Sequence, residues 1–265
     1  MMGMPKVVIL CGGMGTRLKE ETEFKPKPLV TVGGYPILWH IMKIYSHYGY
    51  NDFILCLGYK GDAIKQYFLN YSYLTQDFSI NLKTRDKSFH NGETNIPDWK
   101  ITLVDTGQTS NTGARIKKIQ KYIGDDEHFM VTYGDGVANV DINALYEFHK
   151  KHGKVATVTS ISPPPRWSCL KMDPTSQVTS FSKAEKLPNI WVDGGFFVFH
   201  RKVFDYLTDD DDCMLEREPM HRLMSDGKLM TYQHQDFWQC MDTYRDFEYL
   251  NEIWKSGSVP WKVWK

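Results

Sequence analysis

Residues 7–18 read VVILCGGMGTRL, and this stretch decides the fold. Its first four residues form a continuous, mostly β-branched apolar run, which is typical of a strand buried in a parallel sheet. Gly12, Gly13 and Gly15 follow at once, and without a Cβ atom their backbone can approach a ligand closely. Amides at a strand-to-helix turn form a cradle for an anion. The stretch therefore predicts an anion-binding turn at the carboxyl end of a buried strand.

The next segment, KPKPL at residues 25–29, adds positive charge near this turn. Arg17 offers a fixed fork of donors for phosphate oxygens, whereas Lys25 and Lys27 are mobile point charges. The two prolines hold the segment extended, which keeps the lysines out of a helix. The spacing lacks both the lysine of a P-loop and the dinucleotide fingerprint, so an ordinary tight turn is the alternative interpretation.

Strand and helix patterns alternate along most of the chain. We expect strands at residues 7–10, 53–57, 101–105, 129–133, 155–161 and 196–199, and helices at 37–48, 62–71, 114–122 and 142–152. This alternation predicts an α/β fold in which residues 1–265 form one domain on a doubly wound, mostly parallel sheet. Ligands of such sheets bind at the carboxyl ends of the strands. Glycines fall at three of those ends, in Gly12-Gly13, Thr106-Gly107 and Gly134-Asp135-Gly136.

Two regions interrupt the alternation. Residues 86–99 are polar and include a glycine and a proline, which predicts an excursion or lid. Three prolines at residues 163–165 open a second half, where we expect a small β-rich excursion and a C-terminal helical segment. The acidic run at residues 209–212 predicts a solvated loop or the start of a helix.

Composition excludes several classes of protein. Acidic and basic residues balance at 32 each, so the net charge gives no reason to expect a nucleic-acid or membrane partner. The five cysteines are odd in number and lack CxxC spacing, which indicates reduced thiols rather than a disulfide framework or a zinc site. The apolar run at residues 7–10 is too short for a signal peptide or a membrane span. We therefore expect a soluble, cytoplasmic protein.

A second feature suggests chemistry at the glycine turn. Asp135 follows the strand expected at 129–133, and Asp242 lies in a Met-Asp-Thr segment far along the chain. Magnesium prefers carboxylate and phosphate oxygens and needs only one or two protein carboxylates. Two aspartates distant in sequence could meet and hold the metal against a triphosphate. A turn or capping role is the alternative for either residue alone.

These residues resemble the signature of the sugar-phosphate nucleotidyltransferases, and most closely that of the glucose-1-phosphate cytidylyltransferase branch. GGMGTRL followed by KPKPL is the superfamily's motif. Further matching segments run nearly end to end: PILWHIMKIYSHYG, CLGYKGDAIKQYF, TLVDTG, YGDGVANVDI, GGFFVF, EREPM, FWQCMDT and PWKVW. The resemblance implies a Rossmann-like fold that binds CTP and assembles as a homo-oligomer.

The resemblance also implies residue roles. Asp135 and Asp242 would hold Mg²⁺, with Mn²⁺ as a possible substitute, and Arg17 and Lys27 would complete the catalytic set. Arg115 would serve the triphosphate across a subunit contact. Residues 1–160 would form the nucleotide-binding half, and residues 161–265 the acceptor-binding half with an oligomerisation tail. The nucleotide would be bound by Leu10, Gly12, Gly13, Gly15, Thr16, Arg17, Lys25, Lys27, Thr106, Gly107, Thr112, Gly113, Arg115 and Asp135.

The acceptor pocket departs from the family pattern. Ser168 stands where the family has a glycine, and Asp193 where it has an asparagine. An ionised aspartate only accepts hydrogen bonds and favours a cation or a hydroxyl, although it can also simply hold a turn. The family's Glu-Lys-Pro segment is out of register at residues 183–187. The expected acceptor-binding residues are Arg166, Ser168, Lys183, Glu185, Lys186, Asp193 and Gly194.

The predicted reaction transfers CMP from CTP to a phosphorylated acceptor and releases pyrophosphate. Glucose-1-phosphate, which would give CDP-glucose, is the default acceptor. The alternatives are an amine-bearing acceptor such as phosphoglutamine, another phosphorylated amino acid or a phosphonate, a non-catalytic nucleotide-binding subunit, and a scaffold that uses the aromatic tail at Trp254, Trp261 and Trp264. Structural roles are expected for His40, His47 and His149.

Overall fold

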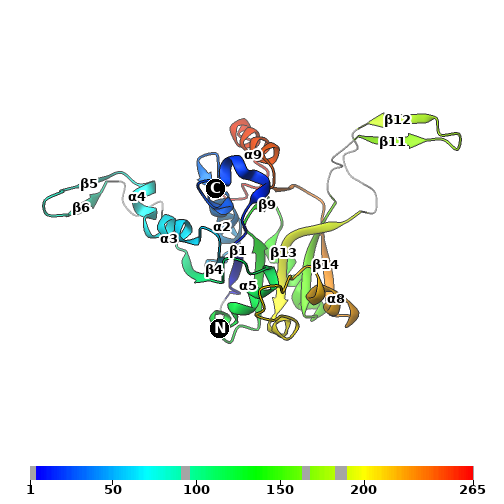
Figure 1. Cartoon of the computed structure of the whole chain (residues 1–265), viewed down its shortest axis with the longest axis horizontal. Coiled ribbons are helices and arrows are strands. Elements are labelled where there is room, and N and C mark those ends of the chain that lie inside the picture. The colour runs from blue at the N-terminus through cyan, green and yellow to red at the C-terminus, as the bar shows by residue number, and fades with distance from the viewer. Residues whose placement is uncertain (1–3, 91–95, 163–167, 183–189, 265) are drawn as a thin grey trace.

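A seven-stranded sheet forms the centre of the computed structural model, which describes residues 4–90, 96–162, 168–182 and 190–264 (Figure 1). The strand order is β14-β10-β13-β8-β1-β4-β7. Strand β13 is antiparallel to both neighbours, and the other neighbouring pairs are parallel. The strands are β1 (Val7–Cys11), β4 (Asp52–Leu57), β7 (Lys100–Asp105), β8 (His128–Tyr133), β10 (Ala156–Ile161), β13 (Val192–His200) and β14 (Leu229–His234).

Strand β1 is buried on both faces. Its residues pair with β4 on one side and with β8 on the other. Because side chains alternate along a strand, Val7 and Ile9 enter one hydrophobic cluster, whereas Val8 and Leu10 enter the other. The apolar run at residues 7–10 therefore forms the centre of a sheet with a core on each side.

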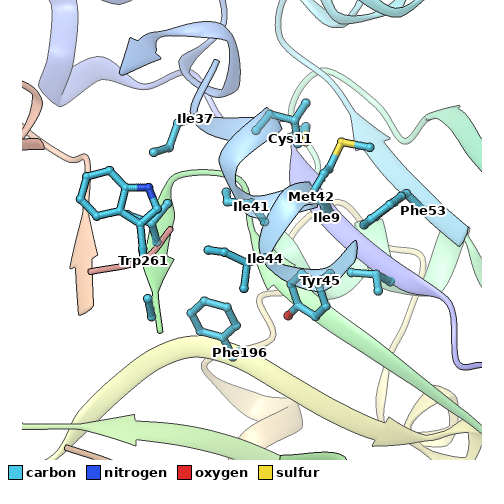
Figure 2. Close-up of a cluster of buried hydrophobic side chains, with 14 of the residues drawn as sticks. Ile9, Cys11, Ile37, Ile41, Met42, Ile44, Tyr45, Phe53, Phe196 and Trp261 are labelled. Carbon is cyan, nitrogen blue, oxygen red and sulfur yellow. The ribbon is translucent and has the colours of Figure 1, made fainter. Parts of the chain in front are cut away.

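Helices cover both faces, which confirms the predicted doubly wound fold. One cluster contains buried residues of α2 (Ile37–His47), α3 (Gly61–Leu69), α7 (Ile142–His152) and α9 (Tyr244–Ser256). Figure 2 shows Ile41 and Tyr45 of α2 facing this cluster near Phe196 of β13. The opposite cluster contains residues of α5 (Thr112–Lys118), α6 (Gln120–Ile123), α8 (Glu218–Ser225) and the 3-10 helix η3 (Arg201–Tyr206).

Short elements complete the fold around the sheet. The glycine turn leads into η1 (Thr16–Leu18) and α1 (Lys19–Thr22), and the KPKPL segment contains η2 (Lys27–Leu29). Two small ladders join β2 (Thr31–Val32) to β3 (Tyr35–Pro36) and β9 (Gly136–Ala138) to β15 (Trp238–Cys240). No helix within the described ranges is long and apolar enough to cross a membrane.

Two hairpins extend from the body on opposite sides (Figure 1). One contains α4 (Tyr71–Thr75), β5 (Phe78–Ile80) and β6 (Lys87–Phe89), so the predicted excursion begins earlier than residue 86. The other contains β11 (Cys169–Met172) and β12 (Val178–Ser182), the β-rich excursion expected in the second half. Both hairpins carry exposed apolar side chains.

The aromatic tail packs on its own domain. Trp261 is fully buried in the cluster that contains α2, and its Nε1 donates to Nδ1 of His40 at 3.4 Å. Burial lowers the pKa of His40 to about 4, so this histidine is a neutral part of the core. The burial of His40 agrees with the structural role expected for it, whereas the buried Trp261 is not free for the scaffold role given as one alternative for the tail.

We predict that Trp261→Ala strongly destabilises the fold. Removing the fully buried indole leaves a cavity in the core, which costs about 3–5 kcal/mol. Urea unfolding followed by circular dichroism measures the change. Trp191→Ala is the matched control because Trp191 is exposed, and equal losses in the two variants would contradict the assignment of Trp261 to the core.

Candidate active site

The ammonium of Lys27 joins two carboxylates that are far apart in the sequence. Its Nζ donates to Oδ2 of Asp135 and to Oδ1 of Asp242, each at 2.6 Å. The two oxygens therefore lie no farther apart than twice this distance. The side chain of Lys27 is 11% exposed, so these are its main partners rather than water. The structure thus brings together the two aspartates that the sequence suggested as a pair.

Local structure fixes the positions of Lys27, Asp135 and Asp242. Pro26 and Pro28 flank Lys27 at the start of η2. Asp135 lies between β8 and β9, and Asp242 lies two residues after β15. Strand β9 pairs with β15, and Met241 N donates to Asp135 O at 2.8 Å. Asp135 and Asp242 therefore both lie next to this small ladder.

The start of α9 fixes the main chain at Asp242. Thr243 and Asp246 form a capping box, in which each side chain accepts from the other's backbone N–H. The same Asp246 carboxylate accepts from the amide of Asp242 at 3.2 Å. The side chain of Asp242 is therefore held at a helix N-terminus, where a negative charge is favoured.

Arg17 adds a second cation from the glycine turn. Its Nη1 lies 2.9 Å from Oδ2 of Asp242, and its side chain is 75% exposed. Arg17 is thus positioned at the site yet open to a ligand. Burial opposes the charged form of Lys27. The carboxylates of Asp135 and Asp242 nevertheless raise the pKa of Lys27 above its ordinary value. Lys27 is consequently cationic at neutral pH.

The two aspartates fit the requirements of a divalent cation. Their oxygens already share one positive centre, the Lys27 ammonium, and Mg²⁺ binds through one or two carboxylates together with substrate phosphates. Among the described residues no group of three or more His, Cys, Asp or Glu side chains could hold a metal alone. The donor set therefore fits a metal that arrives with a phosphorylated ligand.

A cleft of about 360 Å³ surrounds these groups. It is lined by ten of the expected nucleotide-binding residues, which are Leu10, Gly12, Gly13, Gly15, Thr16, Arg17, Lys27, Thr112, Arg115 and Asp135. The remaining four lie elsewhere. Lys25 forms an ion pair with Glu21 at 3.5 Å, and Gly113 packs against Cys213. Thr106 and Gly107 both hydrogen-bond the guanidinium of Arg115.

The side chain of Arg115 ties three loops of its own chain together. It is buried and donates to the carbonyl oxygens of Gly12, Leu57 and Gly107 and to Oγ1 of Thr106 at 2.8–3.1 Å. A Cβ atom on Gly12 would come within 2.1 Å of this guanidinium, which requires glycine there. These bonds come from Nη1 and Nη2, and Arg115 also lines the cleft, so its expected reach to the triphosphate across a subunit contact stays a prediction.

The acidic run at residues 209–212 also supports the site. It lies in a loop, as predicted, but Asp211 is not simply solvated: it accepts from Thr109, Ser110 and Lys118. These hydrogen bonds lower its pKa to about 2. The run therefore anchors the loop that lines one side of the cleft.

Sequence reasoning missed Tyr133, a cleft residue in contact with two carboxylates. Its hydroxyl lies 2.5 Å from Oε1 of Glu216 and 3.0 Å from Oδ2 of Asp193. The other Glu216 oxygen accepts from Thr112 at 2.6 Å, and the other Asp193 oxygen accepts from Gly195 N at 2.7 Å. One phenol proton cannot serve both carboxylates at once. Asp193 is exposed as a residue, but the packing around its carboxyl, together with the negative charge of Glu216, raises the pKa of Asp193.

The other expected acceptor residues are only partly described. Gly194 is buried and its carbonyl accepts from Trp238 Nε1 at 2.7 Å. Ser168 is exposed just before β11. Arg166, Lys183, Glu185 and Lys186 lie outside the described residues. Of the three described members of the acceptor set, Asp193 is the one that hydrogen-bonds a residue lining the cleft.

The sequence of this chain matches a known family and known proteins over most of its length. The family model described as nucleotidyl transferase matches residues 6–254. The chain belongs to the nucleotidyl transferase family. Glucose-1-phosphate cytidylyltransferase of Salmonella typhi is 48% identical to this nucleotidyltransferase over 98% of the chain and 100% of its own length. A probable glucose-1-phosphate cytidylyltransferase of Bacillus subtilis is 45% identical with the same coverage.

A solved structure shows the same fold at lower identity. HddC from Yersinia pseudotuberculosis superposes with a TM-score of 0.69 at 22% identity, covering 95% of this nucleotidyltransferase and all of that chain. The family match and the full-length relatives show that the chain is a nucleotidyltransferase enzyme, as the glycine turn and the two aspartates suggested.

We predict that Arg115→Lys destabilises this nucleotidyltransferase by about 2–4 kcal/mol. A single ammonium cannot reach all four acceptors, so buried carbonyl oxygens lose their donors. Urea unfolding measures the loss. Arg245→Lys is the matched control, because Arg245 is exposed on α9. Equal stability of the two variants would contradict the tying role of Arg115.

We predict a pH-dependent stabilisation by Asp193→Asn. Because the folded state raises the pKa of Asp193, ionisation of this carboxyl costs stability as the pH rises through that value. The variant should therefore unfold at a higher temperature than the wild type at pH 7, and the gap should narrow towards pH 3.5. Thermal unfolding across this range tests it, with Asp209→Asn as the exposed control. A gap that does not change with pH would refute the assignment.

Proposed function

We propose that this enzyme transfers CMP from CTP to glucose-1-phosphate, forming CDP-glucose and releasing pyrophosphate. The observation that carries the proposal is the Lys27 ammonium bound to both Asp135 and Asp242 beside the glycine turn. The names of the full-length relatives support the choice of CTP and of this acceptor.

In the proposed reaction, an oxygen of the acceptor phosphate attacks the α-phosphorus in line. A new P–O bond forms, the bond from the α-phosphorus to the bridging oxygen breaks, and its electron pair leaves with pyrophosphate. The acceptor phosphate is largely ionised near pH 7, so no general base is needed. Such transfers depend on positioning and charge neutralisation. We assign that work to Lys27 and Arg17, the two cations nearest the aspartates.

In this proposal the carboxylates of Asp135 and Asp242 exchange the cations of Lys27 and Arg17 for a metal ion when the triphosphate binds. Asp135 and Asp242 would hold Mg²⁺ or Mn²⁺, which supplies charge neutralisation at the triphosphate. Lys27 and Arg17 would then turn from carboxylate oxygens to phosphate oxygens, which are equivalent acceptors for a charge-assisted hydrogen bond. The mobile stem of Lys27 and the exposed side chain of Arg17 allow this change.

The acceptor side carries a second candidate. Asp193, Tyr133 and Glu216 offer more acceptor oxygens than donors, which favours an acceptor whose hydroxyls or ammonium donate hydrogen bonds. An amine-bearing phosphate is therefore the alternative substrate. Glucosamine-1-phosphate distinguishes the two, since it replaces one glucose hydroxyl by an ammonium.

We further propose a cytoplasmic homo-oligomer that uses residues 1–160 for the nucleotide and residues 161–265 for the acceptor. The exposed apolar residues of the two hairpins support self-association, among them Phe78, Ile80, Met172 and Phe181. Light scattering at micromolar concentration would show a mass above that of one chain. Since the tail is buried in its own domain, the hairpins are the better candidates for the contact.

We predict that Lys27→Ala, Asp135→Asn and Asp242→Asn each lower pyrophosphate release by about 10²–10³-fold, the usual cost of removing one transition-state contact. A coupled pyrophosphate assay should cross CTP and the other nucleoside triphosphates with glucose-1-phosphate and glucosamine-1-phosphate, each with and without Mg²⁺. Lys83→Ala is the control, because Lys83 is exposed on a distant hairpin.

Each outcome of this screen bears on one part of the proposal. Magnesium-dependent release with CTP and glucose-1-phosphate supports it in full. Faster release with glucosamine-1-phosphate replaces the acceptor but keeps the reaction. Tight CTP binding without any release overturns the enzymatic assignment in favour of a nucleotide-binding subunit.

A further inference from the structure

A second polar cavity and the active-site cleft lie at opposite ends of the sheet strands. The volume of this second cavity is about 350 Å³, and we call it the basal pocket. Lys154 comes just before β10, Lys228 just before β14, and Lys202 just after β13. Strands β10 and β14 are parallel, and β13 is antiparallel to β10. The three lysines therefore lie at the same end of these strands. Asp193, by contrast, is near the other end of β13.

The lining of the basal pocket carries a net positive charge, because four exposed cations outnumber two carboxylates. Lys154, Lys202, Lys228 and Arg222 line it, against the two carboxylates of Asp205 and Asp226. Among the described residues none of the three ammonium groups has an ion-pair partner. Like charges repel when they are held together, so an anion bound here would relieve that repulsion.

One guanidinium of the lining contacts an aromatic ring. Arg222 lies over the ring of Tyr206 at 5.2 Å, and the Tyr206 hydroxyl donates to Asp226 at 2.8 Å. The Arg222 guanidinium therefore lies against the Tyr206 ring, while the Asp226 carboxylate is bound to the phenol rather than to a lysine. A planar guanidinium with mobile ammonium groups around it matches the tetrahedral oxygens of a phosphate.

The same contacts limit the size of the ligand. A nucleotide base needs an open aromatic or apolar face on which to stack. The lining has two aromatic rings: Arg222 already lies over the Tyr206 ring, and the His200 ring already makes an edge contact with His128 at 5.4 Å. The lining otherwise consists mainly of charged side chains, which favours a compact anion.

We propose that the basal pocket is a second anion site, which binds a compact phosphate such as inorganic pyrophosphate or phosphate. Lys154, Lys202 and Lys228 contact its oxygens together with Arg222. Two elements connect this pocket to the cleft region: β13 runs from Asp193 to His200, and α8 begins two residues after Glu216 and ends near Arg222. The proposal does not depend on the identity of the acceptor.

Equilibrium dialysis of the full chain with radiolabelled pyrophosphate tests the site at a fixed ionic strength near 0.15 M, since salt screens such contacts. Arg17→Ala/Lys27→Ala removes two cations of the cleft and isolates the basal pocket. In this background we expect binding to persist, and Lys202→Gln/Lys228→Gln should weaken it by about tenfold or more for each lysine lost.

Matched variants control for folding and for net charge. Lys83→Gln/Lys255→Gln removes the same charge from exposed positions outside the pocket and should leave binding unchanged. Lys202→Arg/Lys228→Arg keeps the charge and should retain most of the affinity. Unfolding temperatures within a few degrees of the parent show that each variant is folded.

Three results would overturn the proposal. The first is loss of all pyrophosphate binding in Arg17→Ala/Lys27→Ala. The second is unchanged binding after Lys202→Gln/Lys228→Gln. The third is CTP binding more than about tenfold tighter than pyrophosphate in the cleft-disabled background, because a nucleotide and not a compact phosphate would then be the ligand.

Discussion

The ammonium of Lys27 is the contact on which the active site depends. Asp135 and Asp242 stand 108 and 215 residues away in sequence, and both bind the one nitrogen. The β9–β15 ladder forces these carboxylates close together, and two adjacent negative charges are unstable without a cation. The lysine thus stabilises an arrangement that the ladder imposes. A site built in this way is preorganised for a metal and a triphosphate, because its internal cation can be exchanged for another.

On the other side of the glycine turn, Arg115 supplies hydrogen-bond donors to buried carbonyl oxygens. The carboxyl ends of β1, β4 and β7 meet there and leave the carbonyl oxygens of Gly12, Leu57 and Gly107 around one buried guanidinium. Buried carbonyls without donors would cost stability. The resemblance to known enzymes suggests a ligand contact for Arg115, and the structure adds an internal role for the same side chain, because its hydrogen bonds shape the turn. Arg115 lines the same cleft as Arg17 and Lys27.

The sequence predicts those parts of the fold that have a strong local signal. The apolar runs at β1, β4 and β8 mark the buried strands, and the helical spacing of residues 37–48 marks α2. Strand β14 is missed because its residues are largely exposed and it forms by pairing with β10. In the site, Asp135 and Asp242 follow recognisable motifs. The cluster of Tyr133, Asp193 and Glu216 has no such motif, since its members meet only when β8, β13 and the segment before α8 are folded together.

That cluster decides what the departure at Asp193 means for the acceptor. Tyr133 has one proton for two carboxylates, so an acceptor that brings donors completes the network. Glucose hydroxyls and an ammonium both donate, and hydrogen bonding alone does not separate them. Net charge does, because the two carboxylates attract an ammonium more strongly than they attract a neutral hydroxyl. The pairing of Asp193 with Glu216 around one phenol is therefore what would make this site favour a cationic acceptor over a neutral one.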